Sequence, residues 1–182
     1  MTTFEKNFTT AEYQRRIDKT RAAMSDAGHA AIVICDPSNI SWLTGYDGWS
    51  FYTFQAVILS HEGDPFWWGR SMDALGARRT VFMADDENIR GYDDTYVQNP
   101  EKHPMEDLAR LLSELGLDAV QIGVEMDNYY YSAAAHKSLS DAMPKARLAD
   151  ATGLVNWQRA VKSEREIEYM QRAARIVEAM HE

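Results

Sequence analysis

Two spacings of apolar residues alternate along this chain, and each is typical of one kind of secondary structure. Runs that are apolar at successive positions and rich in Val and Ile predict buried strands, whereas apolar residues three or four positions apart predict amphipathic helices. Strands are expected at 30–35, 54–60, 66–69, 80–83, 89–92, 119–126 and 146–149. Helices are expected between Thr9 and Gly28 and at 37–43, 71–79, 104–116 and 129–143. This alternation predicts an α/β fold, a three-layer domain in which helices flank a mixed β-sheet.

The last predicted helix differs from the others in how it ends. Ser163 and Glu166 form a capping box that starts it, and its apolar stripe continues to the final residues without a Gly cap. A helix at a native chain end usually frays through polar residues. We therefore expect one domain at 1–156, and a linker with the first helix of a truncated second domain at 157–182.

The segment 36–55 crowds aromatic residues between two predicted strands, and Gly45 and Gly48 give it a permissive backbone. So much aromatic surface in one loop predicts a binding rim. The rings expected to serve binding are Trp49, Phe51 and Tyr52. For Trp42 and Phe54 a second interpretation is equally open, in which each ring closes the core beside the loop.

Composition and charge narrow the range of partners. The chain has 182 residues, 45% of them hydrophobic, which is enough for a sizeable core. A net charge of -9 without any cluster of Lys and Arg argues against nucleic acid and anionic membranes as partners. The sequence shows no secretory h-region and no apolar run of about 20 residues, so a cytoplasmic location is expected. Cys35 is the one cysteine, and its apolar neighbours predict a small buried side chain.

No catalytic residue and no metal ligand is predicted within this chain. The histidines are scattered without the close pairs that bind a metal ion. The acidic groups at 85–87, 93–94 and 125–127 lie at turns, where carboxylates usually remain solvated. The sequence also lacks a Gly-rich phosphate loop and the glycine elbow of a nucleophilic serine. Small molecules or other proteins are therefore the expected partners, and the chemistry is expected elsewhere.

Three segments resemble the N-terminal domain of the creatinase, prolidase and aminopeptidase P group of pita-bread hydrolases. They are residues 13–17 in the first helix, 36–45 after the first strand and 157–167 near the end. The resemblance implies a ribonuclease H-like fold. Within this group, residues 45–52, Arg70 before the helix that ends at 76–80, 96–99 and 103–105 are most similar to ectoine hydrolases.

The resemblance also implies a function. Such proteins are two-domain, usually homodimeric hydrolases of C–N bonds, and ectoine hydrolases open the cyclic amidine of ectoine. The catalytic domain, with a possible divalent metal ion, would follow this chain, which alone should be inactive. Its own role would be dimerisation and covering the active site of the neighbouring subunit. The residues that this resemblance places at the substrate are Trp49, Phe51, Tyr52, Thr53 and Arg70.

Position 53 departs from the creatinase pattern. Creatinases carry an arginine there that holds the substrate carboxylate, and Thr53 cannot replace such a bidentate contact. This difference argues against creatine as the substrate. Two interpretations of Arg70 remain open: it replaces the missing arginine in binding an anion, or it is a surface arginine at the start of a helix. Two alternatives to an ectoine hydrolase remain: a Xaa-Pro dipeptidase, aminopeptidase or creatinase with the same fold, and a stand-alone binding module.

Overall fold

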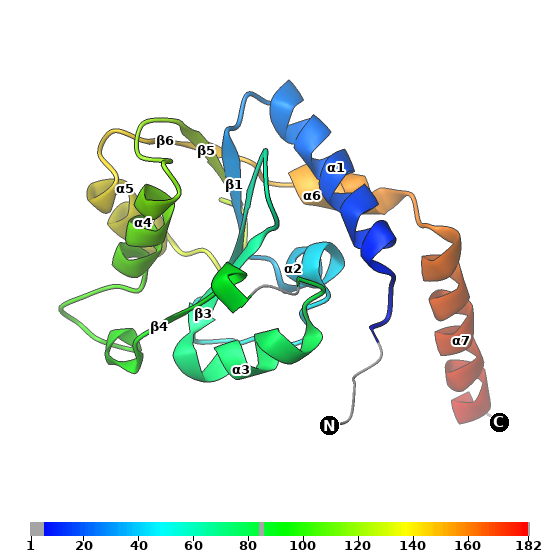
Figure 1. The fold of residues 1–182 in the computed structure, drawn as a ribbon. Helices are drawn as coiled ribbons and strands as arrows, with labels where there is room; N and C mark the ends of the chain where they lie inside the picture. Colours follow the sequence, from blue (N-terminus) through cyan, green and yellow to red (C-terminus); the bar gives the residue numbers. More distant parts are fainter. Residues whose placement is uncertain (1–5, 84–85, 182) are drawn as a thin grey trace.

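The computed structural model describes residues 6–83 and 86–181, and a mixed β-sheet lies at the centre of this part of the chain (Figure 1). The strands are β1 (Ala31–Ile34), β2 (Ala56–Ser60), β3 (Phe66–Arg70), β4 (Ile89–Tyr92), β5 (Gln121–Val124) and β6 (Arg147–Asp150). Their order is β4-β3-β2-β1-β5-β6. β2 pairs antiparallel with β1 and β3, while the pairs β1/β5, β3/β4 and β5/β6 are parallel.

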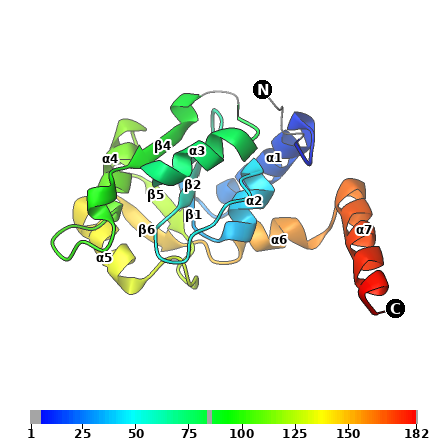
Figure 2. The ribbon, with the colours of Figure 1, turned by 90° about the horizontal axis from the view of Figure 1, so that it is seen from below.

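Helices cover both faces of the sheet (Figure 2). One face carries α1 (Thr10–Asp26), α2 (Pro37–Thr44), α3 (Ser71–Thr80) and α6 (Leu154–Ala160), and the other carries α4 (Met105–Glu114) and α5 (Ala133–Ala142). Successive strand residues point to opposite faces, so Ile32 and Ile34 enter the first core while Ala31 and Val33 enter the second. The predicted three-layer α/β architecture with a mixed sheet is confirmed.

The helix ends follow the local sequence. Thr9 caps α1 by accepting a hydrogen bond from the amide of Glu12, and Gly28 follows the helix with a φ of 71°. Asp36 caps α2 through the amide of Asn39, and Gly45 ends it with a φ of 82°. Two short 3₁₀ turns, η1 (Asp86–Asn88) and η2 (Asp94–Tyr96), flank β4.

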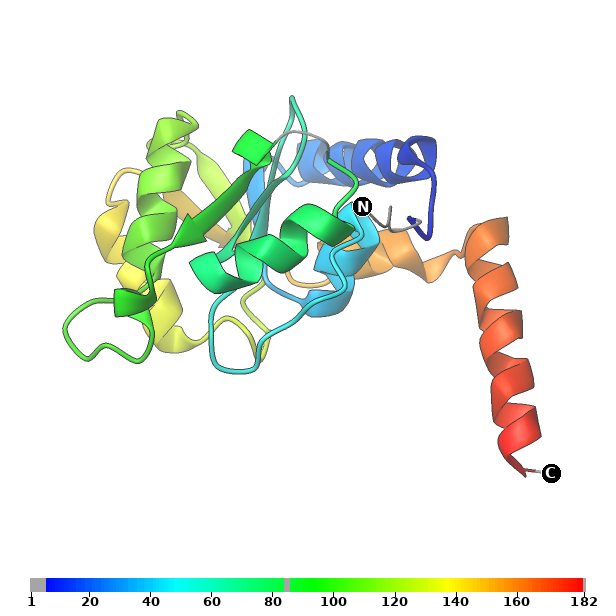
Figure 3. The ribbon, with the colours of Figure 1, turned by 60° about the horizontal axis from the view of Figure 1, so that its bottom comes forward.

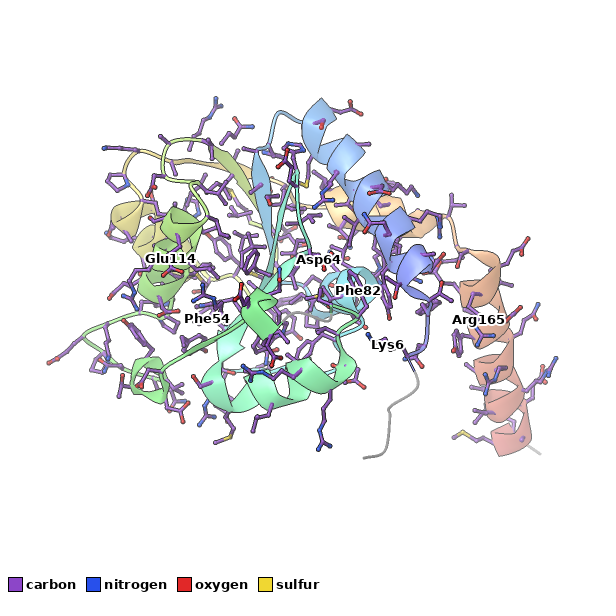
Figure 4. The ribbon with its side chains drawn as sticks, viewed as in Figure 1. Lys6, Phe54, Asp64, Phe82, Glu114 and Arg165 are labelled. Carbon is purple, nitrogen blue, oxygen red and sulfur yellow. The ribbon has the colours of Figure 1, made fainter. Side chains whose placement is uncertain are left out.

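The strand predicted at 80–83 is wrong. α3 continues to Thr80, and the apolar residues after it enter the first core without pairing to a strand. Phe82 stacks on Tyr13 with ring centroids 4.9 Å apart, and its carbonyl accepts a hydrogen bond from Nζ of Lys6 (Figure 4). The apolar character of this run therefore reflects burial in the core and not pairing in the sheet. Residues 84–85 of the acidic turn lie outside the described part of the chain.

The helix predicted at 129–143 begins four residues later. Ser132 accepts a hydrogen bond from the amide of Ala135 and caps α5, so Tyr129, Tyr130 and Tyr131 belong to the loop after β5. This correction matters for function because it moves three aromatic side chains from a helix to an edge of the sheet.

The last helix, α7 (Glu164–His181), extends away from the sheet (Figure 3). Its capping box is present, since the amide of Ser163 donates to Glu166 Oε2 over 2.7 Å and the amide of Glu166 donates to Ser163 Oγ over 3.3 Å. None of its described residues is buried. The large apolar residues that α7 exposes are Ile167, Met170, Ile176, Val177 and Met180.

Trp67 and Trp68 allow the contribution of one buried hydrogen bond to be measured. Both rings are fully buried, on opposite faces of β3. Trp68 Nε1 donates to Asp107 Oδ1 over 2.9 Å, whereas Trp67 Nε1 has no hydrogen-bond partner among the described residues. We expect Trp68→Phe to lower the free energy of unfolding by about 1–2 kcal/mol more than Trp67→Phe, because only the first breaks a hydrogen bond.

Urea denaturation of the two variants measures this difference. Combining Trp68→Phe with Asp107→Ala in a double-mutant cycle controls for the unequal cavities that the two substitutions leave. A coupling energy near zero between Trp68 and Asp107 would contradict the expectation.

Candidate functional site

Several loops meet at one edge of the sheet. β1, β5 and β6 run parallel and end at this edge, and β2 starts there because it is antiparallel to β1. β3 and β4 also end there, since β3 is antiparallel to β2. Ligands of open α/β sheets bind outside the carboxyl ends of strands. The segments 36–55, 93–104 and 125–132 therefore lie where a binding site is expected.

The aromatic loop is anchored at both ends. Tyr46 is buried, which raises its pKa to about 12, and its hydroxyl accepts a hydrogen bond from Gln55 Nε2 over 3.1 Å. Gly48 lies so close to this ring that an added Cβ would be 2.5 Å from the Tyr46 hydroxyl. Near the other end, Thr53 is buried, and its hydroxyl donates to Ser50 Oγ over 2.6 Å. The backbone of the loop is thus fixed while its middle faces outward.

Between these anchors the loop presents its rings to solvent. The exposed fractions are 60% for Trp49, 83% for Phe51 and 62% for Tyr52. Tyr129 is fully exposed, and Tyr130 meets Trp49 edge-on with ring centroids 6.4 Å apart. We call Trp49, Phe51, Tyr52, Tyr129 and Tyr130 the aromatic rim. A cleft of about 80 Å³ separates Phe51 and Tyr52 from the two tyrosines.

Sequence reasoning missed Tyr129 and Tyr130 as members of this rim. It assigned both to a helix, although Ser132 before an Ala-rich run was a usable sign of a later helix start. The three tyrosines in succession would then have been recognised as a second aromatic loop.

Trp42 and Phe54 close the core beside the loop, which is the second of the two interpretations open for them. Both are partly buried, and Trp42 packs against the first core while Phe54 packs against the second. Trp42 Nε1 donates to Glu166 Oε1 over 2.8 Å, and Phe54 lies against His103 with ring centroids 4.9 Å apart. Trp42 also lines a groove of about 440 Å³ that reaches Trp49.

Thr53 and Arg70, the two polar site predictions, are both engaged within the chain. Arg70 forms a bidentate ion pair with Asp94, over 2.8 Å from Nε and 3.2 Å from Nη2, and the hydrogen bond to Asp94 raises the pKa of Arg70. An anion could bind this fork only in competition with Asp94. The role of both residues at a substrate stays a prediction.

Glu125, at the end of β5, joins the elements beneath the rim. Its Oε2 accepts hydrogen bonds from the amides of Cys35 and Asp36, each over 2.7 Å, and its Oε1 accepts one from Asn39 Nδ2 over 2.6 Å. Arg159 Nη1 in turn donates to Asn39 Oδ1 over 2.6 Å. Burial raises the pKa of Glu125, and the three donors oppose this shift. The network ties β1, α2, β5 and α6 together at the base of the aromatic loop.

Within 6–83 and 86–181, no three His, Cys, Asp or Glu side chains gather as they would to hold a metal ion. Cys35 is buried as predicted, and burial raises its pKa well above the ordinary value. No helix in the same ranges is long and apolar enough to cross a membrane. The candidate site is therefore an aromatic surface with polar anchors.

Comparison with known proteins identifies the family. Residues 16–161 match the family described as the creatinase/prolidase N-terminal domain. The chain belongs to this family. It is 54% identical over 175 residues to an ectoine hydrolase from Halomonas elongata, an alignment that covers 96% of the chain and 44% of that protein. The chain thus spans less than half the length of this relative.

Solved structures share the fold of this creatinase/prolidase N-terminal domain. A Xaa-Pro dipeptidase from Bacillus anthracis has a TM-score of 0.71 at 18% identity, covering 92% of this chain and 41% of that one. The N-terminal domain of the peptidase PepQ from Mycobacterium tuberculosis, crystallised as a separate chain, has a TM-score of 0.59 at 20% identity, covering 80% of this chain and 98% of that one. The resemblance seen in the sequence motifs is confirmed.

The Glu125 network of this creatinase/prolidase N-terminal domain yields a stability prediction. Glu125→Gln keeps the shape but offers one oxygen where the wild type offers two, so a buried donor is left unpaired. Asn39 cannot compensate by flipping because its oxygen accepts from Arg159. We expect a loss of about 1–3 kcal/mol in the free energy of unfolding, measured by chemical denaturation. Glu101→Gln, at an exposed position, is the control; equal stability of both variants would contradict the prediction.

Proposed function

We propose that this chain is the N-terminal domain of a creatinase-like hydrolase whose substrate is ectoine, and that its aromatic rim covers the active site of the partner subunit in a homodimer. The observation that carries this proposal is the outward-facing rim: Trp49, Phe51 and Tyr52 expose most of their surface on a firmly anchored loop, and Tyr129 is fully exposed on the loop after β5. Rings that served only the core would not be held in this way. The identity of 54% to an ectoine hydrolase supports the choice of substrate.

The chemistry of the rim suits such a ligand. Ectoine carries a cyclic amidine that is cationic at neutral pH, and a delocalised cation binds favourably to aromatic faces. Each cation–π contact contributes about 0.5–2 kcal/mol, with the larger values where water is excluded. The cleft between Phe51, Tyr52, Tyr129 and Tyr130 would close on a flat ring from two sides once a partner domain covers it.

The proposal places catalysis in a second domain that follows α6. Trp157, Val161 and the apolar residues of α7 are exposed, which supports packing against further protein. A divalent metal ion, if the enzyme uses one, would be bound there and not by this chain. The chain alone would then be inactive, and the whole enzyme would reside in the cytoplasm.

A Xaa-Pro dipeptidase, aminopeptidase or creatinase is the alternative, and the fold shared with a Xaa-Pro dipeptidase supports it. Assays of the full-length enzyme separate these functions. Hydrolysis of ectoine with no turnover of creatine or of a Xaa-Pro dipeptide supports the proposal, and the reverse pattern overturns it. Added metal or a chelator in the same assay decides whether the enzyme needs a metal ion.

The rim itself is tested by substitution in the full-length enzyme. Trp49→Ala, Phe51→Ala and Tyr129→Ala should each lower kcat/KM for ectoine by about 2- to 30-fold, the range that corresponds to losing one cation–π contact. Leu75→Ala, at an exposed apolar position in α3, should leave kcat/KM unchanged. Wild-type kinetics in all three rim variants would exclude the rim from the active site.

Mixed dimers test whether the rim acts on the partner subunit. One subunit carries Trp49→Ala with Phe51→Ala, and the other is inactivated in its catalytic domain. If the rim covers the partner's site, each mixed dimer has one complete site and mixing restores activity. If the rim covers the site of its own subunit, both sites of the mixed dimer remain defective, and mixing the two variants would restore nothing.

A further inference from the structure

A second cavity lies on the far side of the aromatic loop from Tyr129 and Tyr130. It has a volume of about 170 Å³ and is lined by residues 52–54, Tyr92, and residues 96–99 and 102–104. Figure 4 shows one of its walls, Phe54, on the α4 side of the sheet. Pockets for drug-sized ligands measure about 300–1,000 Å³, so this cavity suits a smaller molecule.

Aromatic rings make the walls. Tyr92 is buried, its hydroxyl donates to the carbonyl of Phe54 over 3.1 Å, and Tyr96 meets it edge-on with ring centroids 6.4 Å apart. The ring of Phe54 lies against His103. These contacts fix the rings, so the cavity is formed before a ligand enters.

The cavity is also lined by a cation, Lys102, for which the described residues provide no ion-pair partner. Nζ of Lys102 donates to Thr95 Oγ1 over 2.6 Å and lies 4.3 Å from the centroid of Tyr96. Among the described residues, no Asp or Glu oxygen lies within ion-pair distance of it. Asp93 caps η2 through the amide of Thr95, and its pKa is lowered first by hydrogen bonding to Thr95 and then, more weakly, by the charge of Lys102. A lysine offers three donors, so Lys102 can still bind an anion.

His103 adds a neutral donor beside this cation. Its Nδ1 accepts a hydrogen bond from the amide of Met105 over 3.2 Å, so in the neutral ring the proton lies on Nε2. Burial lowers the pKa of His103, which favours this neutral tautomer. Nε2 makes no hydrogen bond within the described residues and is not among their fully buried polar atoms without partners. His103 lines the cavity, and its Nε2 proton has no partner among the described residues, so it is available to a ligand.

Gln98 closes the cavity with an unusual backbone. Its φ of 51° is the one positive value among the described residues other than glycine. A left-handed conformation at such a residue costs about 1 kcal/mol or more and tends to occur at ligand sites. The turn 97–99 is thus held in a strained form where it lines the cavity.

We propose that this cavity is a binding site for small ring-containing carboxylates, in which Lys102 pairs with the carboxylate, His103 Nε2 donates to it, and Phe54, Tyr92 and Tyr96 surround the ring. The site lies within this domain and does not depend on the proposed function. The shared chemistry is a carboxylate on a compact ring, and two sources supply it: the proposed substrate ectoine, and a cyclic amino acid such as proline.

Titrating the 182-residue chain with each compound, followed by amide chemical shifts, tests the site. A domain of the same fold crystallises as a separate chain, so the isolated chain is a suitable sample. Ectoine, proline or both should shift the amides of the non-proline residues in 95–103, and the compound that binds more tightly identifies the source. 2-Methyl-tetrahydropyrimidine, which is ectoine without its carboxylate, should bind at least about 10-fold more weakly, because the charge-assisted pair is lost.

Matched lysine variants complete the test. Lys102→Met should weaken binding by about 10-fold or more, while Lys145→Met, an exposed lysine at the opposite edge of the sheet, should not change it. Equal affinity of wild type and Lys102→Met, equal affinity for the compound without a carboxylate, or no shifts in a folded chain would each overturn the inference. Ectoine turnover by the full-length enzyme without such binding would leave the proposed function standing, and binding without turnover would leave this site standing alone.

Discussion

The buried carboxylate of Glu125 is the constraint on which the functional edge depends. β1 and β5 are parallel neighbours, so the chain after β1 and the side chain after β5 arrive at the same point. The amides of Cys35 and Asp36 would otherwise lack partners as the chain turns from β1 into α2, and Glu125 satisfies both. The cost of burying a carboxylate is thereby offset by three donors. α2 is fixed in direction, and the aromatic loop follows directly from its last turn.

Arg16, in α1, likewise joins several elements, on the face of the sheet covered by α1, α2, α3 and α6. Its buried guanidinium pairs with Glu12 and Glu166, donates to the carbonyl of Trp42, and lies 4.0 Å from the ring centroid of Phe8. Desolvation lowers its pKa, while the two carboxylates favour the charged form. Because Glu166 lies in the first turn of α7 and Arg159 lies in α6, this pair and the Arg159–Asn39 bond hold the segment between α6 and α7 from both sides. The start of α7 is therefore positioned by the same elements that hold the aromatic loop.

Local sequence patterns predicted most helices and strands. The features that they did not predict depend on contacts between segments distant in sequence. Apolar periodicity and the caps at Thr9, Gly28 and Ser163 depend on neighbours in sequence, so these elements were found. The run after Thr80 is apolar because it is buried, which sequence alone does not distinguish from strand pairing. The exposure of Trp49, Phe51 and Tyr52 could be predicted, because one loop contains more aromatic residues than a core needs. The ion pair between Arg70 and Asp94 could not be predicted, because the two residues meet only through the pairing of β3 with β4.

Contacts between distant segments also determine the two surfaces on either side of the aromatic loop. Ser50 accepts hydrogen bonds from both the amide and the hydroxyl of Thr53, which turns Thr53 inward and leaves Phe51 and Tyr52 outward. Thr53 carries no charge and cannot form the bidentate ion pair of an arginine, so a cation for a carboxylate would have to come from another segment. Lys102 lies across the cavity that Tyr52 and Thr53 also line, about fifty residues further along the chain. Tyr52 borders both the rim cleft and this cavity. The loop is thus one wall shared by the proposed substrate surface and the proposed carboxylate site, and a rearrangement of Tyr52 would change the space on both sides.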